Sequence, residues 1–285
     1  MATPTHPGHD RSAPHAHGKG YAPDFVASVY QAAQDAGGPI FAIAGLQGTG
    51  KSTLSGQIAD LAETEDRKVV SLSIDDFYLG HDARQKLGRE VHPLCATRGV
   101  PGTHDVALAC DVLDSLADGR PTALPRFDKI ADDREPESRW PTVGHADLVI
   151  LEGWFLKVPA EDDAAIAEPI NALERNEDPD GTWRRWSNDA LANDYPALWQ
   201  RLPRLLFLQG PGFDIVPQWR WQQEQTLQAK HPDRKAMSHA QVLRFVQFFE
   251  RVSRQAMRTW PAIADRTIRL DAERQPLDPF QRREA

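Results

Sequence analysis

The chain has 285 residues, a formal net charge of −8 and 40% hydrophobic residues. These values fit a globular protein with one or two buried cores and exclude a small disulfide-stapled scaffold. The acidic balance opposes binding to nucleic acid or anionic lipid. No apolar run approaches the roughly 18 residues of a membrane span, and the start of the chain lacks a signal-peptide core. The two cysteines have no CxxC or metal-type spacing, so we expect a cytoplasmic protein with neither a nucleic-acid nor a membrane partner.

The first segment of the chain differs in composition from the rest. Residues 1–23 are rich in His, Pro, Gly and Ala and hold almost no large apolar side chain, which predicts a disordered tail. Residues 24–285 contain no Ser/Gly linker and no internal repeat, so we predict a single domain. Within it, residues 160–200 are polar, acidic and rich in tryptophan, and we interpret them as a helical insertion that decorates the sheet.

Short apolar runs along the chain predict buried strands. They cover residues 39–45, 69–74, 148–151, 205–208 and 267–270. The stretches between them are long enough for helical crossovers, the pattern of a mostly parallel sheet with helices on both faces. Apolar side chains at helical spacing predict helices over residues 51–62, 106–117 and 240–257. The predicted fold class is therefore α/β, a three-layer sandwich.

A phosphate-binding motif follows the first predicted strand. The segment Gly45-Leu46-Gln47-Gly48-Thr49-Gly50-Lys51-Ser52 matches G-x-x-x-x-G-K-[ST] at every fixed position and precedes a predicted helix. Its glycines let backbone N–H groups turn toward phosphates at the helix N-terminus. Lys51 would reach the β and γ phosphates and Ser52 would ligate Mg²⁺. We expect a nucleoside triphosphate to contact Gly45, Gln47, Gly48, Thr49, Gly50, Lys51, Ser52 and Thr53.

Acidic residues end two other predicted strands. Asp75 and Asp76 follow the second strand, and Glu152 follows the third. The carboxyl ends of parallel strands meet at one edge of a sheet, so we expect these carboxylates beside the phosphate loop. At this edge we expect Glu152 to act as a Walker-B-like ligand for Mg²⁺ or its water. We expect Asp75 to lie near the γ-phosphate as a base or a further metal ligand. Acids at strand ends can also cap helices, and the phosphate loop favours the catalytic alternative.

The order of motifs along the chain carries a family resemblance. The motifs are GxxxxGKS, SxDDFY, RGxxGTHD, PRFDK, LEGW and WRxxQE, and the likeness runs from about residue 39 to residue 265. In this set the chain resembles the D-glycerate 3-kinases of plants and cyanobacteria and their bacterial and fungal relatives, within the phosphoribulokinase/uridine kinase group. The resemblance implies a P-loop NTPase fold, ATP and Mg²⁺ as cofactors, and phosphoryl transfer to a small hydroxylated molecule.

The resemblance also implies roles for single residues. Asp75 would be the base for the acceptor hydroxyl, with Asp76 as the neighbouring alternative. Lys51 and Glu152 would complete the catalytic set together with Arg220, which would neutralise charge on the transferring group. Arg220 can instead form a helix ion pair with the residue four positions later. The implied acceptor contacts are Asp76, Tyr78, Arg98, His104, Asp105, Arg126, Lys129 and Arg134.

D-Glycerate, a small hydroxy acid, is the favoured acceptor, and 3-phosphoglycerate is the expected product. Its carboxylate needs Arg or Lys donors, which Arg98, Arg126, Lys129 and Arg134 could supply. A nucleoside, pantothenate or another small hydroxylated acceptor stays open as an alternative. So does an ATP-binding regulator that keeps the kinase fold without turnover. A GTPase is disfavoured, because the chain has no guanine-selecting N-K-x-D tetrapeptide.

Overall fold

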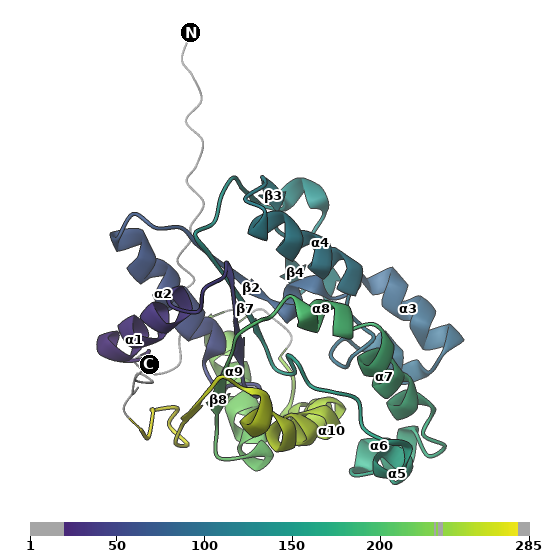
Figure 1. Cartoon of the computed structure of the whole chain (residues 1–285). Coiled ribbons are helices and arrows are strands. Elements are labelled where there is room, and N and C mark those ends of the chain that lie inside the picture. Colours follow the sequence, from purple (N-terminus) through teal and green to yellow (C-terminus); the bar gives the residue numbers. More distant parts are fainter. Residues whose placement is uncertain (1–19, 231, 233–235, 279–285) are drawn as a thin grey trace.

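The fold is built on a five-stranded parallel sheet (Figure 1). The computed structural model describes residues 20–230, 232 and 236–278. The strand order is β2-β7-β1-β8-β9, and every neighbouring pair is parallel. The strands are β1 (Ile40–Ala44), β2 (Val69–Ser73), β7 (Leu148–Gly153), β8 (Leu205–Gln209) and β9 (Arg266–Arg269). All five predicted strands are thus confirmed.

Helices cover both faces of the sheet, which explains why its central strand β1 is apolar throughout. Successive residues of β1 alternate between two cores: Ala42 and Ala44 pack in one, Phe41 and Ile43 in the other. Figure 1 shows α1 and α2 on one side of the sheet and α4 on the other. The covering helices include α1 (Pro23–Gln34), α2 (Lys51–Thr64), α4 (Val106–Ala117) and α10 (His239–Ile263). The α/β class with three layers is confirmed.

Further elements complete the fold. Two short antiparallel pairs lie outside the main sheet: β3 (Thr122–Ala123) with β6 (Thr142–Val143), and β4 (Phe127–Asp128) with β5 (Asp133–Arg134). The remaining helices are α3 (His81–Glu90), α5 (Asp163–Ala167), α6 (Ala172–Glu177), α7 (Thr182–Asn193), α8 (Pro196–Gln200) and α9 (Val216–Lys230). No helix in the described part of the chain combines the length and the apolar character that a membrane span requires.

The beginning of the fold lies closer to the N-terminus than predicted. Most of the predicted tail, residues 1–19, lies outside the described residues. Tyr21 and Pro23, which the prediction placed in the tail, belong to the fold instead. The Tyr21 side chain is 6% exposed and its hydroxyl donates to the Thr49 carbonyl at 2.6 Å, while Pro23 begins α1. The fold therefore begins no later than Tyr21, because that aromatic ring is buried against the phosphate loop.

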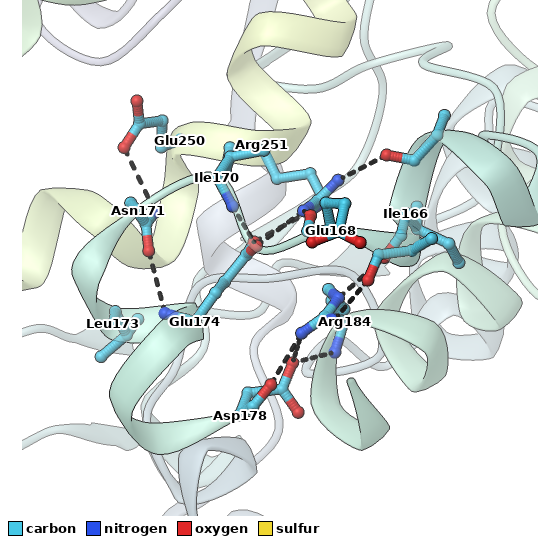
Figure 2. Close-up of polar contacts among 12 residues, drawn as sticks. Ile166, Glu168, Ile170, Asn171, Leu173, Glu174, Asp178, Arg184, Glu250 and Arg251 are labelled. Carbon is cyan, nitrogen blue, oxygen red and sulfur yellow. Dashed lines mark hydrogen bonds and ion pairs between the residues drawn. The ribbon is translucent and has the colours of Figure 1, made fainter. Parts of the chain in front are cut away.

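Helices α5 to α8 occupy the predicted insertion, and buried ion pairs connect α5, α6 and α7 with one another and with α10 (Figure 2). Arg184 on α7 is 4% exposed and donates to the Asp178 carboxylate at 3.0 Å and to the Ile166 carbonyl at 2.7 Å. Arg251 on α10 forms a second pair with Glu174 on α6 at 2.6 Å. Buried charges need such partners, so this network specifies how the insertion packs.

Replacing Arg184 by methionine should strongly destabilise the protein. The change keeps most of the side-chain volume but leaves Asp178 buried without its cation, which costs about 3–5 kcal/mol of unfolding free energy. Urea denaturation followed by circular dichroism measures the loss. The matched control is Arg185→Met at the exposed neighbouring position, for which we expect a change within about 0.5 kcal/mol. Equal losses in the two variants would contradict this account.

Candidate active site

The phosphate loop adopts a conformation that requires glycine. Gly48 and Gly50 have φ angles of +86° and +88°, in the left-handed region that residues with a Cβ atom rarely adopt. A Cβ atom on Gly48 would also lie 2.7 Å from the Cβ of Trp219. The loop leads directly into α2, which begins at Lys51. Its backbone N–H groups therefore lie at a helix N-terminus, a favourable place for phosphate.

A cation, a hydroxyl and a carboxylate meet at the end of this loop. The Lys51 ammonium donates to the Leu46 carbonyl at 3.1 Å and lies 4.0 Å from Glu152 Oε2. Ser52 Oγ donates to Glu152 Oε1 at 2.7 Å. Burial lowers the pKa of Lys51, and the charges of Glu152 and Asp75 oppose that shift. Strand register explains the geometry, because Glu152 on β7 pairs with Ile43 on β1, just before the loop.

The Ser52–Glu152 pair fits a magnesium ion. Mg²⁺ prefers oxygen ligands and in kinases usually binds one or two carboxylates together with the phosphates of the nucleotide. The described residues contain no group of three or more His, Cys, Asp and Glu side chains that could hold a metal. Ser52 and Glu152 could thus hold Mg²⁺ with a bound nucleotide supplying further oxygens.

The side chains of the two neighbouring aspartates make different contacts. A single 3₁₀ turn, Ile74–Phe77, follows β2 and is closed by a capping box with Ser73. Asp76 serves this cap, since its Oδ2 accepts from the Ser73 N–H at 2.9 Å. Burial raises the pKa of Asp76 to about 6, although the Arg126 charge counteracts the shift. Asp75 makes no such contact with the cap through its side chain and faces the main cavity of the protein instead.

The Asp75 carboxylate has one paired oxygen and one without a partner. Its Oδ2 accepts from the Lys129 ammonium at 2.6 Å. Its Oδ1 is buried and has no hydrogen-bond partner within the described part of the chain. Burial alone would raise the pKa of Asp75, but the charge and hydrogen bond of Lys129 outweigh it and lower the pKa. Asp75 is therefore an ionised carboxylate at neutral pH, able to accept a proton or a hydrogen bond.

The RGxxGTHD segment lies against the Asp75 turn. The Leu79 N–H donates to the Thr103 carbonyl at 2.9 Å, and the Asp105 N–H donates to the Phe77 carbonyl at 2.8 Å. The rings of Tyr78 and His104 stack at 4.4 Å. This pairing brings residues about 25 positions apart next to each other, as the predicted acceptor set requires.

Two of the four predicted acceptor cations line the cavity, and two do not. Arg98 and Lys129 line it. Arg126 turns to the Asp76 carboxylate at 3.5 Å, and Arg134 pairs with Asp105 at 3.2 Å. Of the four cations that could supply the field for an acceptor carboxylate, Arg98 and Lys129 therefore lie in the cavity, while Arg126 and Arg134 lie outside its lining. Carboxylates engage the first two as well, since Arg98 pairs with Asp132 and Lys129 with Asp75.

The main cavity has a volume of about 810 Å³ and joins the phosphate loop to Asp75. The predicted residues that line it are Gln47, Gly48, Gly50, Lys51, Ser52, Thr53, Asp75, Tyr78, Arg98, Lys129 and Arg220. Those that lie outside its lining are Gly45, Thr49, Asp76, His104, Asp105, Arg126, Arg134 and Glu152. Gly45 and Thr49 shape the loop from behind, since Thr49 Oγ1 donates to the Leu46 carbonyl at 2.9 Å. His104, predicted to contact the acceptor, is 6% exposed and lies behind Tyr78.

Arg220 combines a place in the cavity lining with the helix ion pair that the sequence offered as its alternative role. It lines the cavity, and it also forms the i, i+4 ion pair with Glu224 at 3.3 Å. Its guanidinium lies 5.7 Å from the centre of the Phe245 ring. The ion pair therefore fixes Arg220 on α9 without removing it from the cavity.

Several cavity residues escaped the sequence analysis. Arg274 follows β9, and its Nε donates to the Gly48 carbonyl at 2.6 Å while its guanidinium stacks over Trp219 at 4.8 Å. No motif surrounds Arg274, so no signal in the sequence marks it. Phe245 and Phe249 on α10 also line the cavity, whereas the sequence analysis used their apolar spacing only to predict a helix over residues 240–257. Trp154 could have been found, since it belongs to the LEGW motif that follows Glu152.

Comparisons with known proteins agree with this architecture. No family model matches the chain. It is 32% identical over 220 residues to the "uncharacterized kinase mug58" of Schizosaccharomyces pombe, across 74% of this chain and 78% of that protein. It is 32% identical over 145 residues to the chloroplastic D-glycerate 3-kinase of Arabidopsis thaliana, across 46% of this chain but only 32% of that longer protein.

A solved structure shows the same fold. The D-glycerate 3-kinase from Cryptococcus neoformans var. grubii matches with a TM-score of 0.71 at 22% identity, over 89% of this chain and 95% of that one. The fold, the phosphate loop at the end of β1 and the similarity to the fission-yeast kinase lead to one conclusion. The chain belongs to the family of P-loop kinases that includes D-glycerate 3-kinase and its fungal relatives.

Proposed function

We propose that this chain is an ATP-dependent kinase that transfers the γ-phosphoryl group of ATP to the 3-hydroxyl of D-glycerate, giving 3-phosphoglycerate and ADP. The supporting observation is that one cavity holds the phosphate loop, the ionised Asp75 and two cations, Arg98 and Lys129. A phosphate-binding end, a base and a carboxylate-binding end are the parts that such a transfer needs. The D-glycerate 3-kinases among the relatives favour glycerate as the acceptor.

The nucleotide end uses the loop, Lys51 and the Ser52–Glu152 pair. The loop N–H groups and the Lys51 ammonium bind the phosphates. Ser52 and Glu152 would hold Mg²⁺, which when bound would neutralise charge on the phosphate oxygens. Arg220 on α9 supplies further positive charge to the group in transfer.

The acceptor end positions one hydroxyl against the γ-phosphate. Arg98 and Lys129 bind the glycerate carboxylate through charge-assisted hydrogen bonds. The 3-oxygen forms the new bond to phosphorus, the bond from phosphorus to the bridging oxygen breaks, and ADP leaves with that electron pair. Asp75 accepts the hydroxyl proton late in the transfer, which suits a carboxylate of low pKa.

A nucleoside acceptor is the second candidate, and one observation favours it. The cavity that holds Asp75 is also lined by the aromatic side chains of Trp154, Phe245 and Phe249. Aromatic walls suit a planar base better than they suit the three-carbon chain of glycerate.

An acceptor screen tests the proposal directly. ADP release with MgATP would be measured with D-glycerate, L-glycerate, uridine, pantothenate and ribulose 5-phosphate, and phosphorus NMR would identify any product. We expect turnover with D-glycerate and a 3-phosphoglycerate signal. Turnover with uridine alone would establish the second candidate. If ATP binds and no acceptor stimulates ADP release, the glycerate assignment fails, and a regulator without turnover becomes the better account.

Replacing Asp75 by asparagine should abolish transfer while ATP binding remains. The amide cannot take up the hydroxyl proton, so we expect kcat to fall by at least about 100-fold. Asp76→Asn is the matched control, because its amide oxygen can still accept from the Ser73 N–H. Steady-state kinetics and ATP titration calorimetry compare the two variants. A larger loss of kcat in Asp76→Asn than in Asp75→Asn would contradict the proposal and indicate that Asp76 is the base.

Replacing Lys129 by methionine should weaken acceptor binding. Loss of a charged hydrogen-bond donor predicts a rise of about 10-fold in KM for D-glycerate, with KM for ATP unchanged. Removing Lys129 also raises the pKa of Asp75, so the assays are run at pH 8, where Asp75 is ionised in the variant as well. Lys86→Met removes a surface lysine that pairs with Glu90 on α3, and we expect wild-type constants for it. An unchanged KM for D-glycerate in Lys129→Met would remove this lysine from the acceptor site.

A further inference from the structure

The helical insertion touches the acceptor side of the active site through two aromatic residues. Tyr195, which directly precedes α8, is fully buried. Its hydroxyl accepts from the Gly102 N–H at 3.0 Å and lies 2.7 Å from His104 Nδ1. Trp186 on α7 covers Gly102, where an added Cβ atom would come within 2.5 Å of the indole ring. The RGxxGTHD segment is therefore seated between the Asp75 turn and the insertion.

The hydrogen bonds of Tyr195 determine which nitrogen of His104 carries the proton. A backbone N–H can only donate, so Gly102 occupies a lone pair of the Tyr195 oxygen. The hydroxyl hydrogen then needs an acceptor, and His104 Nδ1 is the one that the described residues provide. Leaving a buried hydroxyl hydrogen unpaired would cost about 1–3 kcal/mol.

The charge state of His104 completes this assignment. Burial lowers the pKa of His104 to about 3, against the smaller opposing effect of the Asp75 charge. The imidazole is therefore neutral, with one N–H and one lone pair. Because Nδ1 accepts from Tyr195, the hydrogen resides on Nε2.

Two buried polar atoms without partners remain in this part of the structure. His104 Nε2 and Asp75 Oδ1 are both buried and make no hydrogen bond within the described residues. His104 stacks on Tyr78, which lines the cavity and whose side chain interacts with that of Asp75. The Asp75 charge also acts on His104, although no hydrogen bond joins the two residues. A donor and a carboxylate oxygen that both lack partners are complementary, and buried polar groups are rarely left unpaired.

We infer that Tyr195 is a positioning residue of the acceptor site. It holds His104 as the Nε2–H tautomer, so that the imidazole presents a donor, and not a lone pair, to the carboxylate of Asp75. A lone pair in that place would repel the carboxylate and turn it away from the acceptor hydroxyl. The inference rests on the proposed function in taking Asp75 as the base. It also makes the insertion, which the buried ion pairs of Figure 2 hold against α10, a part of the active site.

The ring-nitrogen spectrum of His104 tests the tautomer without any turnover. In protein labelled with ¹⁵N at histidine, the His104 signals are assigned by their loss in His104→Gln. We expect the Nε2–H tautomer in the wild type at pH 7 and a mixture of tautomers in Tyr195→Phe. An Nδ1–H tautomer or a charged ring in the wild type would overturn the inference.

Kinetics of Tyr195→Phe test the positioning role. Because a misdirected base affects the transition state more than ground-state binding, we expect kcat to fall by about 10- to 100-fold with both KM values unchanged. Trp199→Phe is the control, since Trp199 packs on Tyr195 and Phe155 and its Nε1 makes no hydrogen bond within the described residues. Equal kcat values in wild type and Tyr195→Phe, or equal losses in both variants, would refute the role.

A second pair of variants covers the case in which Tyr195→Phe folds poorly. A glutamine amide reaches the place of Nε2, whereas an asparagine amide reaches only that of Nδ1. We expect His104→Gln to retain at least about 10-fold more kcat than His104→Asn, and the opposite order would overturn the inference. If no acceptor is turned over, the proposed function is refuted but the tautomer assignment is not. The imidazole spectrum tests that assignment independently of turnover.

Discussion

The hydrogen-bond register of three parallel strands determines where every charged group of the site lies. Glu152 on β7 pairs with Ile43 on β1 and with Ser73 on β2. The phosphate loop, Glu152 and the Asp75 turn therefore leave the sheet at one level. A shift of one residue in β7 would send Glu152 to the opposite face of the sheet. The buried apolar side chains that set this register thus specify the chemistry as well as the fold.

Much of the fold followed from the sequence because its signals are local. Apolar runs predicted the five strands, and the phosphate loop was recognisable from its glycines, Lys51 and Ser52. The sequence did not separate Asp75 from Asp76, since the two are adjacent in the same motif. The geometry of one turn separates them, because Asp76 closes the cap at Ser73 and leaves Asp75 to the cavity.

Other parts of the site depend on contacts between distant segments, which a single sequence does not display. Arg126 meets Asp76 from 50 positions away, and this pairing removed it from the predicted acceptor cluster. Phe249 follows the same helical spacing as its core neighbours, so periodicity could not place it on the cavity. Tyr195 lies in a segment expected to be decoration, although it reaches His104 across 91 positions.

The backbone carbonyls of the phosphate loop are held from both ends of the described chain. Tyr21, before the first helix, donates to the Thr49 carbonyl, and Arg274, after the last strand of the sheet, donates to the Gly48 carbonyl. The eight-residue motif is therefore shorter than the unit that keeps it in shape. A minimal protein cut at the outermost motifs would keep every signature residue and lose both braces. Design of shortened or fused versions has to retain Tyr21 and Arg274, because each holds one carbonyl of the loop.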